Sequence, residues 1–136
     1  MSLPEYGKVI CYIVRDDCVL AFAHRGNSAA GIQVPAGTIE LGESPEEAAL
    51  REATEETGLD GIALVAKLGE SEYRFDHPPR LEIHRRYFFQ MRVAIAAEHW
   101  SHFAEGHIWF DFSWLPLSQQ DTLAADQGAM LHLVRL

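Results

Sequence analysis

Apolar positions in this chain gather in short runs of strand length, separated by clusters of Gly, Pro, Asp and Ser. The ranges predicted as strands are 9–14, 19–23, 32–34, 62–75, 81–93 and 107–112. Asp16 and Asp17 join the first two runs, which predicts a β-hairpin. Residues 36–42 are predicted to be a loop. The end of the chain, 118–136, is predicted to be helical with a break near Gly128.

One further helix is marked at both of its ends. Ser44 is a favourable N-cap residue, Pro45 occupies the first helical position, and Glu47 completes a capping box with Ser44. Helix-forming residues continue from there, and Gly58 is placed to take the left-handed conformation that ends many helices. We therefore expect a helix over residues 44–57.

The length of 136 residues predicts a single domain, 1–136. Strands on both sides of a central helix, followed by a terminal helix, favour an α/β or α+β fold whose sheet is covered on both faces. Hydrophobic residues make up 48% and charged residues 23%, which is typical of a globular domain and not of a disordered chain. Neither a membrane-spanning run nor the apolar core of a signal peptide is recognisable, so we expect a cytoplasmic protein without membrane association.

The two cysteines, Cys11 and Cys18, flank the predicted hairpin turn. In that hairpin Arg15 would face Cys18, so the two thiols would not lie opposite each other. We interpret both as buried, reduced strand residues rather than as a disulfide.

Acidic residues are concentrated in one part of the chain. Eleven Lys and Arg against twenty Asp and Glu give a net charge of −9, which argues against binding DNA or RNA through a basic face. Between Glu40 and Asp60 lie eight acids and one base, a balance of −7, and the remainder carries −2. Such a cluster is either a solvated helix face or a site for a hard cation.

Three of these acids, Glu52, Glu55 and Glu56, share one face of the predicted helix. The stripe predicted to face the core lies beside them and consists of Ala49, Leu50 and Ala53. Like charges at this spacing destabilise a helix by about 0.2–0.5 kcal/mol per pair. A divalent cation such as Mg²⁺ or Mn²⁺ would remove that repulsion, because both ions prefer oxygen ligands. Arg51 can pair with Glu47 or Glu55, or reach back into the preceding loop.

The acidic region also carries a sequence motif. Gly37, Glu43 and the run Arg51-Glu52-Ala53-Thr54-Glu55-Glu56-Thr57-Gly58-Leu59 have the spacing of the Nudix box, and the chain resembles that family. The likeness extends more loosely over most of the chain. It implies a Nudix fold, with a mixed β-sheet sandwiched between α-helices and the box forming a loop, a helix and a second loop. It also implies Mg²⁺- or Mn²⁺-dependent hydrolysis of a nucleoside diphosphate linked to another group.

The resemblance assigns roles to the residues of the box. The implied metal ligands are Glu52, Glu55, Glu56 and the carbonyl of Gly37. Glu52 is the implied general base, either directly or through a metal-bound water, and Arg51 would orient it. Glu43 would either brace the loop against the helix, with Arg51 as a partner, or join the metal ligands.

Some subfamilies take a base or an extra ligand from a later loop, for which Glu98 and Glu105 are the candidates here; the alternative is an ordinary surface acid. Arg25, Arg85 and Arg86 are candidates for binding a substrate phosphate, and the alternative for each is a surface salt bridge. Because Arg85 and Arg86 are neighbours in a predicted strand, only one of the two can enter a given cleft.

The aromatic residues near the end of the chain are either candidates for substrate binding or expected core residues. Trp100 and Phe103 lie in a segment without strand pattern and are candidates for stacking on a base. Trp109, Phe110 and Phe112 are expected to be core residues of the last strand.

We expect an enzyme whose partner is a small nucleotide substrate, with nucleoside triphosphates, oxidised ones included, ranked before ADP-ribose and nucleotide sugars. The order of substrates is not settled by subfamily markers. The downstream proline of some ADP-ribose-cleaving members is not clearly matched, because Pro78 and Pro79 come late, and Tyr73 lies only near the tyrosine position of diadenosine polyphosphate hydrolases. One alternative is a nucleotide-sensing module of the same fold, which would be expected to lose box carboxylates. Another is a diphosphate isomerase, which the two core-like cysteines fit poorly. A homodimer is expected by analogy alone.

Overall fold

A computed structural model describes residues 2–104, 106 and 108–136 of the chain. The strands are β1 (Glu5–Arg15), β2 (Cys18–His24), β3 (Ile32–Gln33), β4 (Ala36–Thr38), β5 (Ala63–His77), β6 (Arg80–Arg92), β7 (Trp100–Ala104) and β8 (Ile108–Pro116). The helix α1 covers Pro45–Thr57, and 3₁₀ turns cover η1 (Ser28–Ala30), η2 (Leu117–Thr122), η3 (Ala124–Asp126) and η4 (Leu131–Leu133). Among these residues no helix is long and apolar enough to cross a lipid bilayer.

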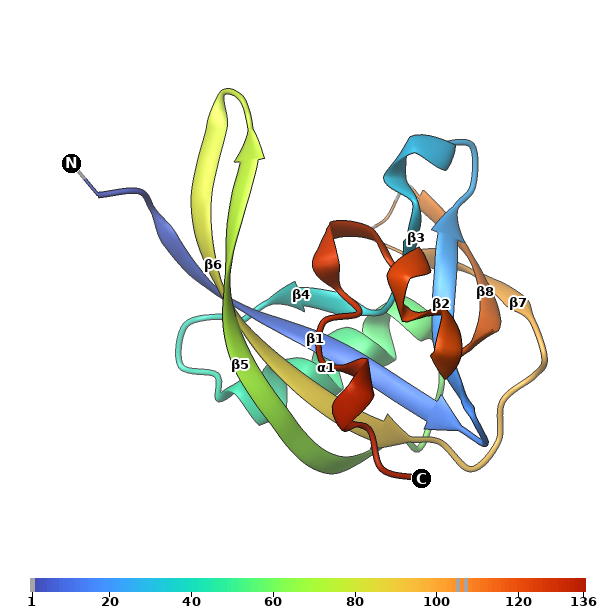
Figure 1. The fold of residues 1–136 in the computed structure, drawn as a ribbon. Coiled ribbons are helices and arrows are strands. Elements are labelled where there is room, and N and C mark those ends of the chain that lie inside the picture. Colours follow the sequence, from blue (N-terminus) through green and yellow to red (C-terminus); the bar gives the residue numbers. More distant parts are fainter. Residues whose placement is uncertain (1, 105, 107) are drawn as a thin grey trace.

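The strands form one mixed sheet in the order β5-β6-β1-β2-β8-β7, with β3 added beside β2 and β4 beside β1. The pairing of β1 with β6 is parallel, and the other pairings are antiparallel. Strands β1 and β2 pair next to their turn, where Arg15 lies opposite Cys18 as predicted, and then diverge (Figure 1). The opening between them is occupied by β3 and β4, which brings the segment before α1 to the centre of the molecule.

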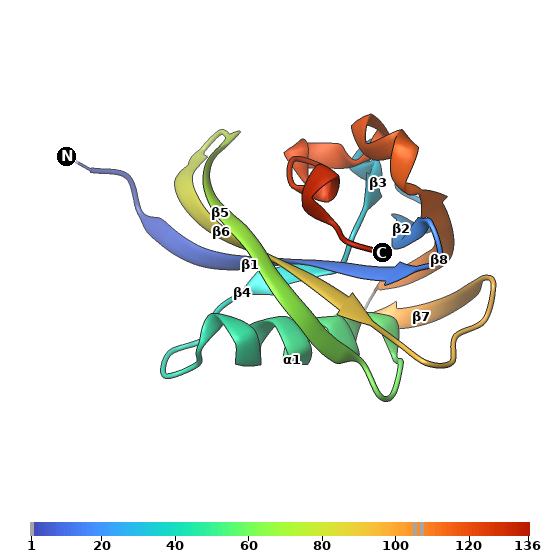
Figure 2. The ribbon, with the colours of Figure 1, turned by 60° about the horizontal axis from the view of Figure 1, so that its bottom comes forward.

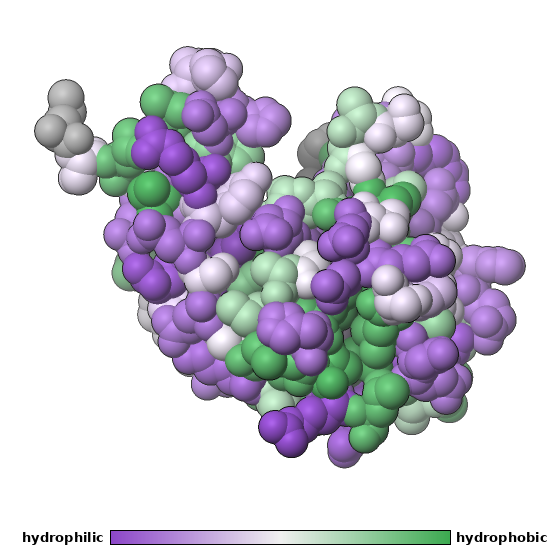
Figure 3. Space-filling model, in the orientation of Figure 1, coloured by the Kyte–Doolittle hydropathy of each residue, from purple (hydrophilic) through white to green (hydrophobic). Residues whose placement is uncertain are grey.

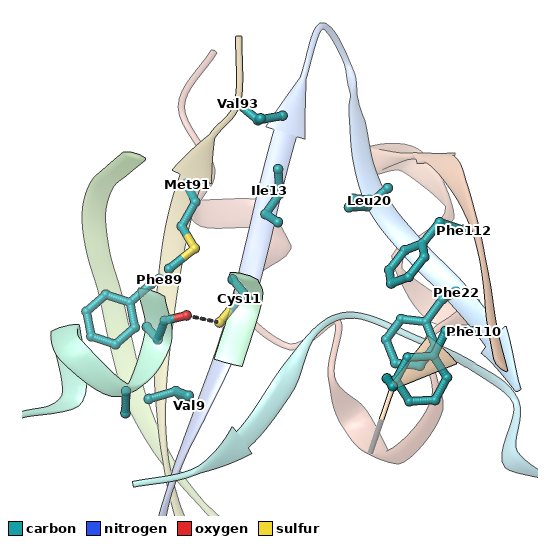
Figure 4. Close-up of a cluster of buried hydrophobic side chains, with 14 residues drawn as sticks. Val9, Cys11, Ile13, Leu20, Phe22, Phe89, Met91, Val93, Phe110 and Phe112 are labelled. Atoms are coloured by element: carbon teal, nitrogen blue, oxygen red, sulfur yellow. Dashed lines mark hydrogen bonds between the residues drawn. The ribbon is translucent and has the colours of Figure 1, made fainter. Parts of the chain in front are cut away.

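The sheet lies between α1 on one face and the C-terminal 3₁₀ turns on the other (Figure 2). On the α1 face, side chains of β1, β6, β2 and β8 pack against small residues of the helix, and the Cys11 thiol donates to the carbonyl of Ala49 at 3.5 Å (Figure 4). On the opposite face a second cluster, which includes Tyr12 and Phe88, packs under the C-terminal turns. Both faces of the sheet are therefore buried, which the order of elements predicted.

The helix α1 begins and ends where its sequence predicts. The Ser44 hydroxyl accepts from the Glu47 backbone N–H at 3.1 Å, and the Glu47 carboxylate accepts from the Ser44 N–H at 3.0 Å. Gly58 follows with φ 73°, the left-handed conformation that glycine adopts without strain. Local hydrogen bonds thus fix both ends of the segment that carries the carboxylates.

The predicted terminal helix over 118–136 is wrong. Leu123 is extended and bridges to Ile32 of β3, and Ala125 and Asp126 have φ of 53° and 58°, which no right-handed helix contains. The buried Gln127 side chain accepts from the Val34 backbone N–H at 2.8 Å. Contacts with the sheet therefore replace the regular hydrogen bonds of a helix in this segment.

Two other local predictions also need correction. Residues 36–42 are not entirely loop, because Ala36–Thr38 pair with β1 in an antiparallel ladder. Cys11 is buried as expected, whereas Cys18 is partly exposed beside the hairpin turn. The first difference arises because pairing with β1 turns part of the predicted loop into a strand. The second arises because Cys18 lies at the turn end of its strand.

Candidate functional site

The acidic residues around α1 are organised by one guanidinium group. Arg51 forms a bidentate pair with Glu43, at 2.7 Å from Nε and 2.9 Å from Nη2. Its Nη1 lies 2.8 Å from a Glu52 oxygen and 3.4 Å from a Glu55 oxygen. Arg51 also donates to the Thr38 carbonyl at 3.0 Å, so this side chain connects β4, the following loop and α1. The predicted contact between Glu43 and Arg51 is present.

This pairing changes the protonation behaviour of the two groups. Hydrogen bonds from Arg51 and then from the Glu40 backbone N–H lower the pKa of Glu43 to about 2. The same contacts with Glu43 raise the pKa of Arg51. Glu43 is therefore a carboxylate at neutral pH with both oxygens engaged, an arrangement that favours a bracing role over coordination of a cation.

Glu52 packs directly against the backbone of β4. A Cβ atom added to Gly37 would lie 2.0 Å from the Glu52 carboxyl carbon, so the absence of a side chain at Gly37 is what admits this carboxylate. Glu52 is partly buried, at 16% side-chain exposure. The box residues Gly37 and Glu52, fifteen positions apart by their numbers, thus meet at the edge between α1 and the sheet.

Glu56 lies one turn further along the same helix. It is 6% exposed, and its Oε1 accepts from the Ala36 backbone N–H at 2.7 Å. Glu55, by contrast, is exposed and reaches back to Arg51. The three predicted metal ligands therefore differ: Glu52 and Glu56 face β4, and Glu55 lies at the solvent side.

The donor set has the chemistry that a hard divalent cation requires, with carboxylate and carbonyl oxygens and a net negative charge. Within the described ranges, however, no three Asp, Glu, His or Cys side chains converge closely enough to hold one ion. Arg51 holds Glu52 and Glu55, while Ala36 holds one oxygen of Glu56. Glu52 and Glu55 would have to turn away from Arg51 to bring the oxygens together, and Glu56 with the Gly37 carbonyl would complete the set.

A pocket of about 280 Å³ adjoins this centre on the opposite face of the sheet. It is lined by Lys8, Ile10, Gln33, Ala36, Gly37, Tyr73, Phe75, His77, His84, Arg86, Ala125 and Gln127. Figure 3 shows the molecular surface hollowed between the β5–β6 hairpin and the C-terminal turns. Because Ala36 and Gly37 line the pocket and also contact Glu56 and Glu52, strand β4 connects the pocket with the carboxylates.

The three candidate arginines have different surroundings. Arg25 is exposed, pairs with Asp111 at 2.7 Å and lies over the Trp109 ring, away from the pocket. Arg85 lies near Glu5 and Glu72, at 3.6 and 3.5 Å. Arg86 is 6% exposed and lines the pocket. The prediction that only one of the adjacent pair enters a given cleft agrees with this placement.

The aromatic candidates do not line the pocket. Trp100 belongs to β7, not to a loose segment; its ring stacks on Phe112 at 5.1 Å, and its indole N–H donates to the Thr57 carbonyl at 3.0 Å. Phe103 lies in the same strand and contacts Trp109 edge to face. Trp109 itself is 42% exposed, so the expectation that it is a core residue is wrong. Alternate residues of a strand face opposite sides of the sheet. Phe110 and Phe112 of β8 therefore face the core, whereas Trp109, next to Phe110, faces outward.

Of the two late-loop acids, Glu98 lies away from the carboxylates of α1. Glu98 is exposed and pairs with Arg15 at 2.9 Å, at the end of β1. Gly37 pairs with Val9, which lies six residues before Arg15 on β1. Six residues of an extended strand span about 20 Å, so the Arg15–Glu98 pair is far from Gly37. The other candidate, Glu105, lies outside the described residues.

Several pocket residues were not candidates in the sequence. Lys8 directly precedes the apolar run of β1, His84 lies among charged residues of β6, and Tyr73 is considered only for its position along the chain. A signal was available for Lys8, a cation in a strand whose other face is largely apolar, whereas Arg86 is already a phosphate-binding candidate from the sequence. The pairing of β1 with β6 that brings them together could not be read from either strand alone.

Comparison with known proteins identifies the family. The profile of the NUDIX domain matches residues 6–134. Nudix hydrolase 25 of Arabidopsis thaliana is 37% identical over 79 residues, which are 58% of this chain and 43% of that protein; the match thus spans less than half of that relative's length.

Similar solved structures have the same fold. A UDP-X diphosphatase superposes with a TM-score of 0.70 at 21% identity, covering 98% of this chain and 62% of that one. A MutT protein from Methanosarcina mazei Go1 gives 0.68 at 21% identity, covering 97% and 94%. The dihydroneopterin triphosphate pyrophosphohydrolase of E. coli gives 0.69 at 17% identity, covering 95% and 92%. With the profile matching nearly the whole chain and the box residues meeting at the edge of β4, the chain belongs to the Nudix family.

Proposed function

We propose that this chain is a divalent-metal-dependent pyrophosphohydrolase that cleaves a nucleoside diphosphate linked to a second group. The observation that carries the proposal is the meeting of Glu52, Glu56 and Gly37 at the edge of β4, beside a pocket. Family membership supports it, because Nudix hydrolases generally use divalent metal ions. We infer Mg²⁺ or Mn²⁺, because the donors are oxygens.

The reaction adds one water across a phosphoanhydride. The water oxygen forms a bond to phosphorus, the bridging P–O bond breaks, and the bridging oxygen leaves with its phosphate. A bound divalent cation would supply neutralisation of the diphosphate charge and polarisation of the phosphoryl oxygens. The chain must supply a position for the water and a base for its proton.

Glu52 is the base in this proposal. It is partly buried and held in place by Arg51 at 2.8 Å, so its carboxylate is oriented before substrate arrives. Arg51 in turn is fixed by Glu43 and by the Thr38 carbonyl. Arg51 and Glu43 are positioning residues, and their effect on turnover passes through Glu52.

The cation ligands in this proposal are Glu52, Glu56, Glu55 and the Gly37 carbonyl. Glu56 is already directed toward β4 by the Ala36 N–H, whereas Glu55 would have to leave Arg51. We rank nucleoside triphosphates, oxidised ones included, before ADP-ribose and nucleotide sugars as substrates. The cytoplasmic location and the homodimer stay predictions.

A panel of nucleotides tests this function. Canonical and oxidised nucleoside triphosphates, ADP-ribose, nucleotide sugars and diadenosine polyphosphates are incubated with the protein in Mg²⁺, in Mn²⁺ and in EDTA, and the products are identified. We expect cleavage of one class between two phosphates, and none in EDTA. A ligand that raises the melting temperature without being cleaved in either metal would contradict the proposal and favour a nucleotide-sensing module.

A further inference from the structure

Two cations, Lys8 and Arg86, line the pocket side by side. Lys8 of β1 and Arg86 of β6 are register partners in the parallel pairing, so their side chains leave the same face of the sheet from backbones about 4.8 Å apart. Neither takes part in an ion pair within 4.0 Å among the described residues. The charge of the pair is therefore not neutralised by direct contact with an acid.

Arg86 is held in one orientation by neutral groups. Its guanidinium lies 3.8 Å from the centroid of the Tyr73 ring, and its Nη1 donates to the Ala125 carbonyl at 2.7 Å. Its Nε is buried and has no hydrogen-bond partner in the structure as described. A buried donor without a partner destabilises the folded state, and a guanidinium is a group that matches two oxygen acceptors at once.

Lys8 lies between Arg86 and the carboxylates of the acidic centre. Its ammonium donates to the Thr38 hydroxyl at 2.6 Å, and Thr38 is its register partner on β4. Thr38 also accepts from Arg51 through its carbonyl, so the row Thr38, Lys8, Arg86 leads from the acidic centre into the pocket.

Two acids whose charges act on Lys8, namely Glu82 and Glu52, are already engaged by other cations. Glu82 is engaged by Arg80 and by His84, at 3.0 and 2.9 Å. Burial is the main cause that lowers the pKa of Lys8, and the charges of Glu82 and Glu52 act in the opposite sense. Burial also lowers the pKa of Arg86, against the charges of Tyr73 and Asp126. Both cations are thus partly desolvated at one side of a hollow in a chain of net charge −9.

We propose that Lys8 and Arg86 form an anion subsite that binds a second anionic group of the substrate, beyond the phosphoanhydride that is cleaved. The part of the substrate in the pocket would then carry a phosphate or carboxylate with oxygens facing the row. This assignment of the substrate class rests on the proposed function, whereas the binding of an anion by the pair does not depend on hydrolysis.

The test is an anion titration of the intact chain in EDTA, followed by ¹H–¹⁵N NMR at constant ionic strength. Without a divalent cation the acidic centre repels anions, so binding reports on the Lys8–Arg86 pair. Inorganic phosphate and acetate are the two charged probes, and uncharged adenosine is the neutral one. We expect saturable shifts of the Lys8, Thr38 and Arg86 amides with phosphate, with acetate, or with both, and the stronger probe identifies the anionic group.

Matched variants decide whether the pair is responsible. Arg86→Met should weaken binding of the stronger probe at least about tenfold, as expected for loss of a charge-assisted hydrogen bond. Arg85→Met is the control, because it removes a cation from the next position of the same strand, on the other side, and should leave binding unchanged. If Arg86→Met does not fold, Lys8→Met gives the decisive comparison.

Three results would overturn the subsite. One is the absence of shifts with both anions, and another is equal binding by Arg86→Met and the parent chain. The third is binding of adenosine at the same amides with an affinity that Arg86→Met leaves unchanged. A chain that hydrolyses nucleotides but gives any of these results retains the proposed function and loses the subsite, so the two failures are distinguishable.

Discussion

The two sides of β4 carry charges of opposite sign, and the charged side chains on each side are contacted by different kinds of group. On the α1 side, carboxylates are gathered around Arg51 and the Ala36 N–H, so the acids are oriented by contacts inside the chain. On the pocket side, Lys8 and Arg86 are oriented by a hydroxyl, a ring and a carbonyl, all of them neutral. The acidic side carries an excess of negative charge, and within the described part of the chain Lys8 and Arg86 form no ion pair. A cation on one side and an anion on the other would complete both.

The largest expected effect is loss of turnover in Glu52→Gln. Removing a general base typically lowers the rate about 10²- to 10⁴-fold, and the amide keeps the shape of the side chain against Gly37. The measurement is kcat on the best substrate of the panel. Glu46→Gln, an exposed position of the same helix, is the control and should retain the parent rate. Equal kcat for Glu52→Gln and the parent would remove Glu52 from the mechanism.

Arg51→Met should destabilise the fold. It leaves Glu43, Glu52 and Glu55 without the group that orients them, and loss of a partly buried charge partner costs about 2 kcal/mol in the free energy of unfolding. Urea unfolding at pH 7 measures the loss. Arg85→Met, whose ion pairs are solvent-exposed, should change stability by less than about 0.5 kcal/mol. Similar values for the two variants would show that Arg51 is no more than a surface cation.

The ion pair between Arg51 and Glu43 predicts that stability depends on pH. The pKa of Glu43 is lowered in the folded state to about 2, from an ordinary value of 4.5, so its contribution to stability is present above about pH 4.5. That contribution is lost as pH falls from 4.5 toward 2, because the unfolded chain binds the proton first. The urea midpoint of the parent should therefore fall more steeply over this range than that of Arg51→Met. Parallel curves would contradict the assignment.

Gly37→Ala should lower activity with little effect on folding. The added Cβ would collide with the end of the flexible Glu52 side chain, which can rotate away from β4 at small energetic cost. We expect about a tenfold loss of kcat, because small displacements of catalytic groups cost rates of this order or more. Thermal unfolding checks the fold. An alanine variant with the parent kcat would show that the contact between Glu52 and β4 has no part in turnover.

The smallest effect is expected at the start of α1. Ser44→Ala removes the N-cap acceptor and should lower the free energy of unfolding by about 1 kcal/mol, measured in urea. Ser113→Ala, on an exposed position of β8, is a control that should stay within about 0.5 kcal/mol. If both variants were equally stable, the capping box would not hold the acidic segment in place.

The acidic side could be predicted from the sequence because its signals are local. The caps of α1 lie within one segment, and the spacing of Glu52, Glu55 and Glu56 makes them neighbours on the helix, although Glu55 lies at the solvent side. The pocket side could not, because Lys8 and Arg86 meet through a parallel pairing of distant strands. The predicted C-terminal helix is wrong for a related reason. Its hydrogen bonds go to β3 and the sheet, so the helical propensity of its sequence is overridden by tertiary contacts.

We propose that Glu52, Glu55 and Glu56 bind one divalent cation together, although Arg51 and Ala36 engage them in the structure. Titration of Mn²⁺ followed by electron paramagnetic resonance measures this without substrate. We predict saturable binding by the parent chain and by Glu46→Gln, and at least about tenfold weaker binding by Glu56→Gln, which loses a charged ligand. Equal Mn²⁺ affinity in Glu56→Gln and the parent, or no binding in the parent, would contradict the account.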